Sequence, residues 1–81
     1  MTVTDDDIRK VARDTVAYAA DAIEPVFVYW SKHNRKFSKS PLRNLRGEKT
    51  SHIVGVYNAD SHLHMIEDDI RHWIANRPRA E

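Results

Sequence analysis

The fold depends on how residues 25–30, PVFVYW, are interpreted. The valines and aromatic residues favour a β-strand, and the proline disfavours helical geometry at the residue before it. The helical spacing of the apolar residues nonetheless continues across the proline, from Val16 and Ala19 through Ile23 to Trp30. A proline in the first turn of a second helix, or a kink in one long helix, also explains the stretch.

Upstream of this stretch the sequence predicts a helix from about Asp5 to Ile23. Thr4 suits the N-cap position, and the three aspartates that follow it suit the positive end of the helix dipole. Apolar residues then recur at helical spacing from Ile8 to Ile23. We interpret the aspartates as capping residues and not as metal ligands, because adjacent helical residues point in different directions.

Downstream, residues 52–57, HIVGVY, present the same ambiguity. Their composition favours a strand, whereas the spacing of Ile53, Val56 and Leu63 is helical. Gly55 counts against the interior of a helix. The last helix is clearer, because Asp60 or Ser61 suits its N-cap and apolar residues from Leu63 to Ile74 mark one face, before an end near Asn76.

The continuous helical spacing at both ambiguous segments favours an all-α fold. We expect one small globular domain over residues 1–81, built as a helical hairpin or bundle from two amphipathic halves with the basic segment 32–49 between them. The alternative is an α+β fold arranged α-β-β-α, with strands near 26–30 and 52–57.

A short extra helix is predicted near residues 41–46 in either architecture. Ser40 suits its N-cap, Pro41 its first position and Gly47 the position after its end. Arg43 and Arg46 are three residues apart and would share one face of such a helix.

Several functional classes lack support in the sequence. None of the 81 residues is a cysteine, which excludes disulfides and thiol catalysis and is typical of a cytoplasmic protein. Gly47 and Gly55 are the only glycines, so there is no phosphate-binding glycine motif and no nucleophile elbow. No apolar run is long enough to cross a membrane. We therefore expect a protein that is not an enzyme and needs no cofactor.

The charge is unevenly distributed although the net charge is only +1. Residues 1–31 carry three bases and six acids, residues 32–49 seven bases and one acid, and residues 50–81 three bases and five acids. A basic segment of this kind is typical of a surface that meets nucleic acid phosphates and releases their counterions. The predicted nucleic-acid-binding residues are Lys32, Arg35, Lys36, Lys39, Arg43, Asn44, Arg46 and Lys49.

The alternative is a modulator or inhibitor, comparable in class to phage accessory proteins, that docks on a host or partner protein. The basic segment would then meet an acidic protein surface. Tyr18, Tyr57 and Trp73 are the candidate contact residues, since aromatic residues often dominate protein interfaces. A chain this short has a small core, which also makes self-association into a homo-oligomer attractive.

A metal site has weak candidates. His64, Asp68 and His72 are spaced four residues apart and would line one face of the last helix. No zinc-binding motif accompanies them, so we interpret them as a solvated polar stripe.

Overall fold

A computed structural model describes residues 3–46 and 52–76 of the chain. It has an α+β fold with the order α1 (Asp5–Ala22), β1 (Val26–Ser31), β2 (Lys36–Pro41), η1 (Leu42–Asn44), β3 (Ile53–Tyr57) and α2 (Leu63–Asn76). The all-α prediction is therefore wrong. The α-β-β-α alternative places β1 and β3 correctly but misses β2, which lies inside the basic segment.

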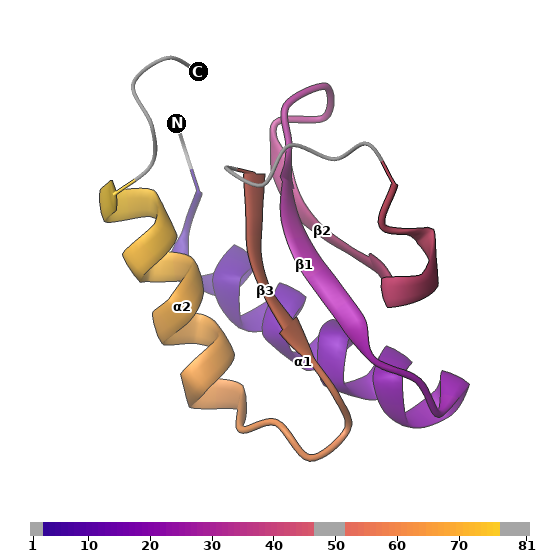
Figure 1. Cartoon of the computed structure of the whole chain (residues 1–81). Coiled ribbons are helices and arrows are strands. Elements are labelled where there is room, and N and C mark those ends of the chain that lie inside the picture. The colour runs from indigo at the N-terminus through magenta and orange to yellow at the C-terminus, as the bar shows by residue number, and fades with distance from the viewer. Residues whose placement is uncertain (1–2, 47–51, 77–81) are drawn as a thin grey trace.

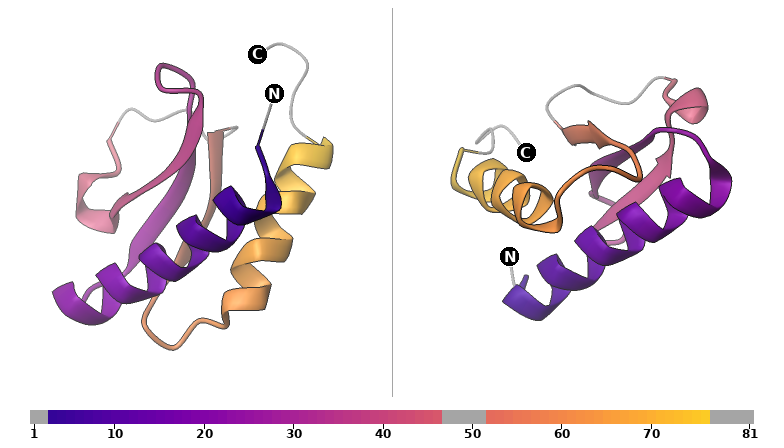
Figure 2. Two further views of the ribbon diagram at one scale, coloured as in Figure 1. Left: turned by 180° about the vertical axis from the view of Figure 1, so that it is seen from behind. Right: turned by 90° about the horizontal axis from the view of Figure 1, so that it is seen from below.

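The three strands form an antiparallel sheet in the order β2-β1-β3. The β1–β2 pairing is regular from Val26 opposite Pro41 to Ser31 opposite Lys36. The β1–β3 pairing contains a bulge, because Val28 lies opposite Gly55 but Tyr29 lies opposite Ile53. Both helices cover one face of the sheet, and η1 lies on the other side (Figures 1 and 2). We call the face away from the helices the outer face.

The central position of β1 explains why its sequence misled. Val26, Phe27, Val28 and Trp30 are all buried, so both faces of this strand are covered. A strand buried on both faces reads as a continuous apolar run, which fits helical spacing as well as a strand. The helical path itself stops at Ile23, whose φ of 54° lies in the left-handed region.

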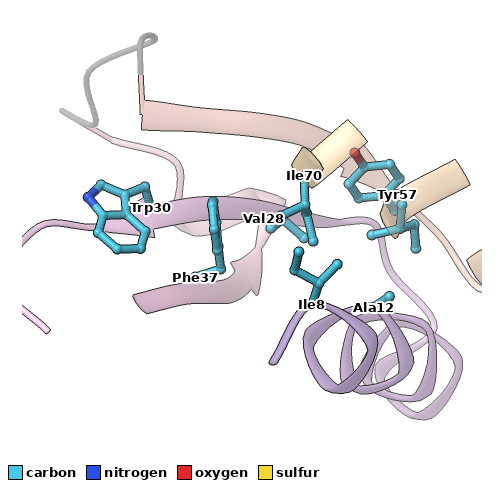
Figure 3. Close-up of a cluster of buried hydrophobic side chains, with 8 residues drawn as sticks. Ile8, Ala12, Val28, Trp30, Phe37, Tyr57 and Ile70 are labelled. Atoms are coloured by element: carbon cyan, nitrogen blue, oxygen red, sulfur yellow. The ribbon is translucent and has the colours of Figure 1, made fainter. Parts of the chain in front are cut away.

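The hydrophobic core lies between the sheet and the two helices (Figure 3). Val28 and Trp30 of β1, Phe37 of β2 and Tyr57 of β3 pack with residues of both helices. The helix residues in this core are Ile8 and Ala12 of α1 and Ile66 and Ile70 of α2. Side chains from three strands and two helices thus share one apolar cluster, which holds the layers together.

At one end of the core, the Phe37 ring packs edge to face with the rings of Trp30 and Trp73. The ring centroids of Trp30 and Phe37 lie 5.0 Å apart, and those of Phe37 and Trp73 lie 5.4 Å apart. Trp73 is on α2, so the contact joins the last helix to the β1–β2 hairpin. Such pairs add about 0.5–1.5 kcal/mol each beyond the burial of their area.

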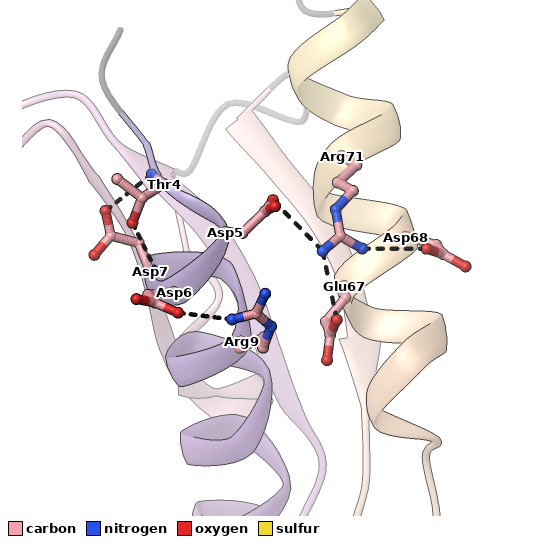
Figure 4. Close-up of polar contacts among 8 residues, drawn as sticks. All are labelled: Thr4, Asp5, Asp6, Asp7, Arg9, Glu67, Asp68 and Arg71. Atoms are coloured by element: carbon pink, nitrogen blue, oxygen red, sulfur yellow. Dashed lines mark hydrogen bonds and ion pairs between the residues drawn. The ribbon is translucent and has the colours of Figure 1, made fainter.

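The start of α1 follows the sequence prediction. The Thr4 hydroxyl accepts a hydrogen bond from the Asp7 amide at 3.2 Å, and the Asp7 carboxylate accepts one from the Thr4 amide at 3.1 Å (Figure 4). This reciprocal capping box satisfies two amides at the helix start. Asp5 also lies 3.6 Å from the Arg71 guanidinium, which links α1 to α2.

The short helix predicted near residues 41–46 is reduced to η1, a three-residue 3₁₀ turn. The Leu42 amide donates to the Pro25 carbonyl at 3.0 Å, which ties η1 to the start of β1. The Leu45 amide donates to the Leu42 carbonyl and ends the turn. Gly47, the predicted terminator, lies outside the described residues.

Neither α1 nor α2, the long helices of the described chain, is apolar enough to cross a membrane.

Candidate functional site

Charge in this fold is segregated by layer. The sheet hairpin and η1 with their flanking residues, 26–46, carry six bases and no acid, and we call this region the basic layer. By contrast, α1 carries five acids and three bases, and α2 carries three acids and one base. The basic layer is thus one side of a two-layer protein, and the helices form an acidic side.

The most exposed part of the basic layer is the turn between β1 and β2. Residues 32–35, with the sequence KHNR, are all exposed, and Lys36 after them is exposed as well. The Asn34 amide donates to the Ser31 hydroxyl at 3.3 Å, which helps to close the turn. Arg35 has a φ of 53°, a conformation that glycine or asparagine adopts more easily than arginine. The turn therefore holds Lys32, Arg35 and Lys36 together at one end of the molecule.

Lys39 lies apart from that group. Its side chain points to the same face of β2 as that of Phe37, the face toward the helices, and it is half-buried. Its ammonium lies 5.8 Å from the centre of the Tyr18 ring on α1, within reach of a cation–π contact. The predicted role of Lys39 as a phosphate contact is therefore less favoured than that of the turn residues.

Arg43 and Arg46 do not form the predicted pair on one helical face. Arg43 lies in η1, where its Nη1 is 2.7 Å from Glu24 Oε2, whereas Arg46 lies beyond the end of that turn. Both arginines and Asn44 are exposed. The Arg43 side chain is two-thirds exposed, so it retains access to solvent beside its acidic partner. Lys49 lies outside the described residues.

One aromatic side chain beside the basic segment, Tyr29, lies on the outer face of the sheet. Tyr29 is half-buried on β1, opposite Ser38 of β2 and Ile53 of β3. Its ring centroid is 5.3 Å from that of Phe27, which is almost fully buried. Trp30 points to the opposite face and belongs to the core. Along a strand, Phe27 and Tyr29 point to one face and Val28 and Trp30 to the other. The sequence therefore predicts the face of Tyr29 once residues 26–31 are recognised as a strand.

The three predicted protein-contact residues have different environments. Tyr18 is 37% exposed on α1. Trp73 is half-buried against Trp30 and Phe37. Tyr57 is buried in the core, and its hydroxyl donates to Asp69 Oδ2 on α2 at 2.7 Å. Of the three, Tyr18 is the side chain most accessible to a partner.

The Tyr57 hydroxyl is held in a tight polar contact. Its burial, and then the hydrogen bond to Asp69, raise the pKa of Tyr57 well above its ordinary value. Gly55 lies on the same face of β3, and a Cβ added there would be 2.5 Å from the Tyr57 hydroxyl oxygen. Glycine at position 55 therefore leaves the space through which this hydroxyl reaches α2.

The candidate metal ligands remain surface residues of α2. His64, Asp68 and His72 are exposed, and Asp68 lies 3.4 Å from Arg71. Within residues 3–46 and 52–76, no three histidine, aspartate or glutamate side chains come together as a metal site would require.

Comparison of the chain with protein-family models, with curated proteins and with solved structures finds no match.

Proposed function

We propose that this protein is a small non-enzymatic regulatory module that binds nucleic acid through its basic layer. The observation that carries the proposal is the segregation of charge, with six bases and no acid in residues 26–46 and an acidic pair of helices behind them. Phosphate contacts provide most of the affinity of such surfaces and depend on concentrated positive charge. The lack of cysteine supports a cytoplasmic setting for this activity.

The turn between β1 and β2 supplies the main phosphate contacts in this proposal. Lys32, Arg35 and Lys36 are exposed there, and none of them forms an ion pair among those described. Arg43 contributes less, because Glu24 already neutralises part of its charge. Tyr29 on the outer face offers a ring on which an unpaired base can stack, which favours single-stranded over double-stranded ligands.

The test is a fluorescence titration of labelled single- and double-stranded DNA and RNA oligonucleotides at several salt concentrations. The informative variant combines Lys32→Ala with Arg35→Gly. Glycine suits the positive φ at position 35, so this variant removes two charges while keeping the turn. For a single-stranded ligand we expect the slope of log affinity against log salt to become shallower by about 1.4, which corresponds to two lost phosphate contacts.

The matched control combines Arg9→Ala with Arg13→Ala, which removes the same net charge from the exposed surface of α1. If both double variants lose affinity equally, binding reflects net charge alone and the basic layer is not the site. An absence of binding to every oligonucleotide at low salt refutes the nucleic-acid proposal outright.

A further inference from the structure

A groove runs between α1 and the free edge of the sheet, next to the turn considered above. It has a volume of roughly 270 Å³. Its walls are Asp7, Lys10, Val11 and Asp14 of α1 and Lys36, Phe37, Ser38 and Lys39 of β2. Val11 and Phe37 both pack on the hydrophobic core, so the groove has an apolar floor. Three lysines and two aspartates border that floor, with both lysines of β2 on the strand wall and both aspartates on the α1 wall.

One wall of this groove is an edge strand. In the described chain β2 pairs only with β1, so the backbone groups along its other edge have no strand partner. Its register with β1 is regular over all six residues of the strand. The opposite edge strand, β3, carries a bulge between Ile53 and Gly55, opposite Tyr29 and Val28 of β1, and a bulge discourages strand addition. An extended chain that pairs with the sheet would therefore add to β2.

We propose that β2 is the docking edge for an extended acidic peptide segment of a partner protein, which adds as a fourth strand and places alternate side chains in the groove. Backbone hydrogen bonds to the edge strand would provide the affinity, and the groove would provide the selectivity. This inference goes beyond nucleic-acid binding, and its surface shares only Lys36 with the proposed phosphate contacts.

The groove also specifies which peptide it accepts. Phe37 and Lys39 are two residues apart on the groove side of β2, so an added strand places two alternate side chains beside them. The first favours an apolar residue, because Phe37 and Val11 form the floor. The second favours an acidic residue, because an opposite charge beside Lys39 stabilises the strand pair. An antiparallel peptide therefore reads acidic-x-apolar from its N-terminus, and a parallel one reads apolar-x-acidic.

A second copy of the same chain fits this edge poorly. Pairing two β2 strands would bring together two segments that each contain Lys36 and Lys39 and no acid. Like charges opposite one another destabilise a strand pair. Lysine on an edge strand also guards against unwanted pairing, and the experiment has to distinguish that protective role from docking.

The probes are ten-residue peptides of threonine with a central Glu-Thr-Val or Val-Thr-Glu, together with versions in which lysine replaces glutamate. A third set carries N-methyl groups on alternate backbone amides, which removes strand pairing without changing the side chains. Binding to the intact protein is followed by NMR shifts and hydrogen exchange of the β2 amides. We expect a glutamate peptide to bind and to protect β2, and its N-methylated copy to bind at least tenfold more weakly.

Charge exchange at Lys39 tests the selectivity. Lys39→Glu should weaken the glutamate peptide by about fivefold relative to the lysine peptide, the size of a cross-strand charge pair. The control, Lys32→Glu, makes the same change of charge on the turn outside the groove and should leave that preference in place. Because each comparison is between two peptides on one protein, a small loss of stability does not alter it.

Three outcomes would overturn the inference. One is that none of the peptides binds at millimolar concentration, which would mean that the lysines only prevent unwanted strand pairing at this edge. Another is that N-methylation has no effect, which excludes strand addition. The last is that the protein alone forms a dimer with protected β2 amides, because a second copy would then occupy the edge.

Discussion

Replacement of Ile23 by glycine should stabilise this protein, against the usual effect of removing a large apolar side chain. Ile23 follows the last residue of α1 and has φ 54° and ψ 46°. β-branched residues rarely adopt this left-handed conformation, because their side chain crowds the backbone. The Ile23 side chain is also 90% exposed, so it buries very little area in return.

The magnitude of the gain follows from three contributions. Relief of the left-handed conformation is worth about 1–2 kcal/mol, with a β-branched residue at the upper end. The greater freedom of glycine in the unfolded chain offsets about 0.4–1 kcal/mol of this. Loss of the one-tenth of the side chain that is buried costs only about 0.2–0.3 kcal/mol. We therefore expect a net gain of about 0.5–1 kcal/mol and a rise in Tm of roughly 2–8 °C.

Urea and thermal unfolding followed by far-UV circular dichroism measure this difference. Ile23→Ala is the control, because it shortens the side chain but keeps the Cβ that strains the backbone, and it should change stability by less than about 0.5 kcal/mol. Ile23→Asn should lie between the two, since asparagine tolerates positive φ. A glycine variant less stable than the parent would refute the reasoning and would mean that the isoleucine side chain makes stabilising contacts.

Three further changes test other contacts by the same unfolding assay. Thr4→Ala should cost about 1 kcal/mol, because it removes the capping box, and Thr4→Ser should restore most of that loss. Gly55→Ala should cost about 1–3 kcal/mol, because the new methyl group overpacks against Tyr57. The cost should be smaller in a Tyr57→Phe background, which lacks the hydroxyl oxygen that is the closest atom. Equal costs in both backgrounds would contradict the contact. Above pH ~10 the folded protein keeps the proton of Tyr57, whereas the unfolded chain releases it. The free energy of unfolding should therefore fall at alkaline pH, and more steeply in the parent than in Tyr57→Phe. The difference in slope should be up to about 1.4 kcal/mol per pH unit. Parallel pH curves for the two proteins would show that the raised pKa is absent.

The two helices were predictable because their ends are chemically distinctive. Thr4 with the aspartates after it defines the start of α1, and the helix ends at Ala22, one residue before the predicted end. The start of α2 at Leu63 is later than predicted, because the turn at 58–61 uses its polar side chains for itself. The Asn58 amide donates to the Ser61 hydroxyl at 3.0 Å, and the Asp60 amide donates to the Asn58 side chain at 2.9 Å.

The sheet was not predictable by the same means. Its central strand is buried on both faces and shows no alternation, so the apolar run of β1 matched helical spacing by coincidence. The edge strand β2 has Phe37 as its one large apolar residue, which is too little for a periodic pattern. The turn between them has Arg35, not glycine, in the left-handed conformation, so the usual mark of a hairpin is missing.

The basic segment itself was found from sequence, but its geometry was not. Charge counting identifies Lys32, Arg35 and Lys36 without any knowledge of the fold. The separation of Lys39 from that group depends on strand alternation, and the pairing of Arg43 with Glu24 depends on how η1 returns to the start of β1. Long-range contacts of this kind leave no local pattern in the chain.

The two-layer distribution of charge has a consequence for the protein in concentrated solution. A basic side and an acidic side on one molecule are complementary, so the basic side of one copy attracts the acidic side of the next. Such a head-to-tail contact joins two different surfaces, so it produces rings or open chains of molecules instead of a two-fold symmetric dimer. Because salt screens the attraction, this protein should dissolve better as ionic strength rises, and dialysis into water should turn its solutions cloudy.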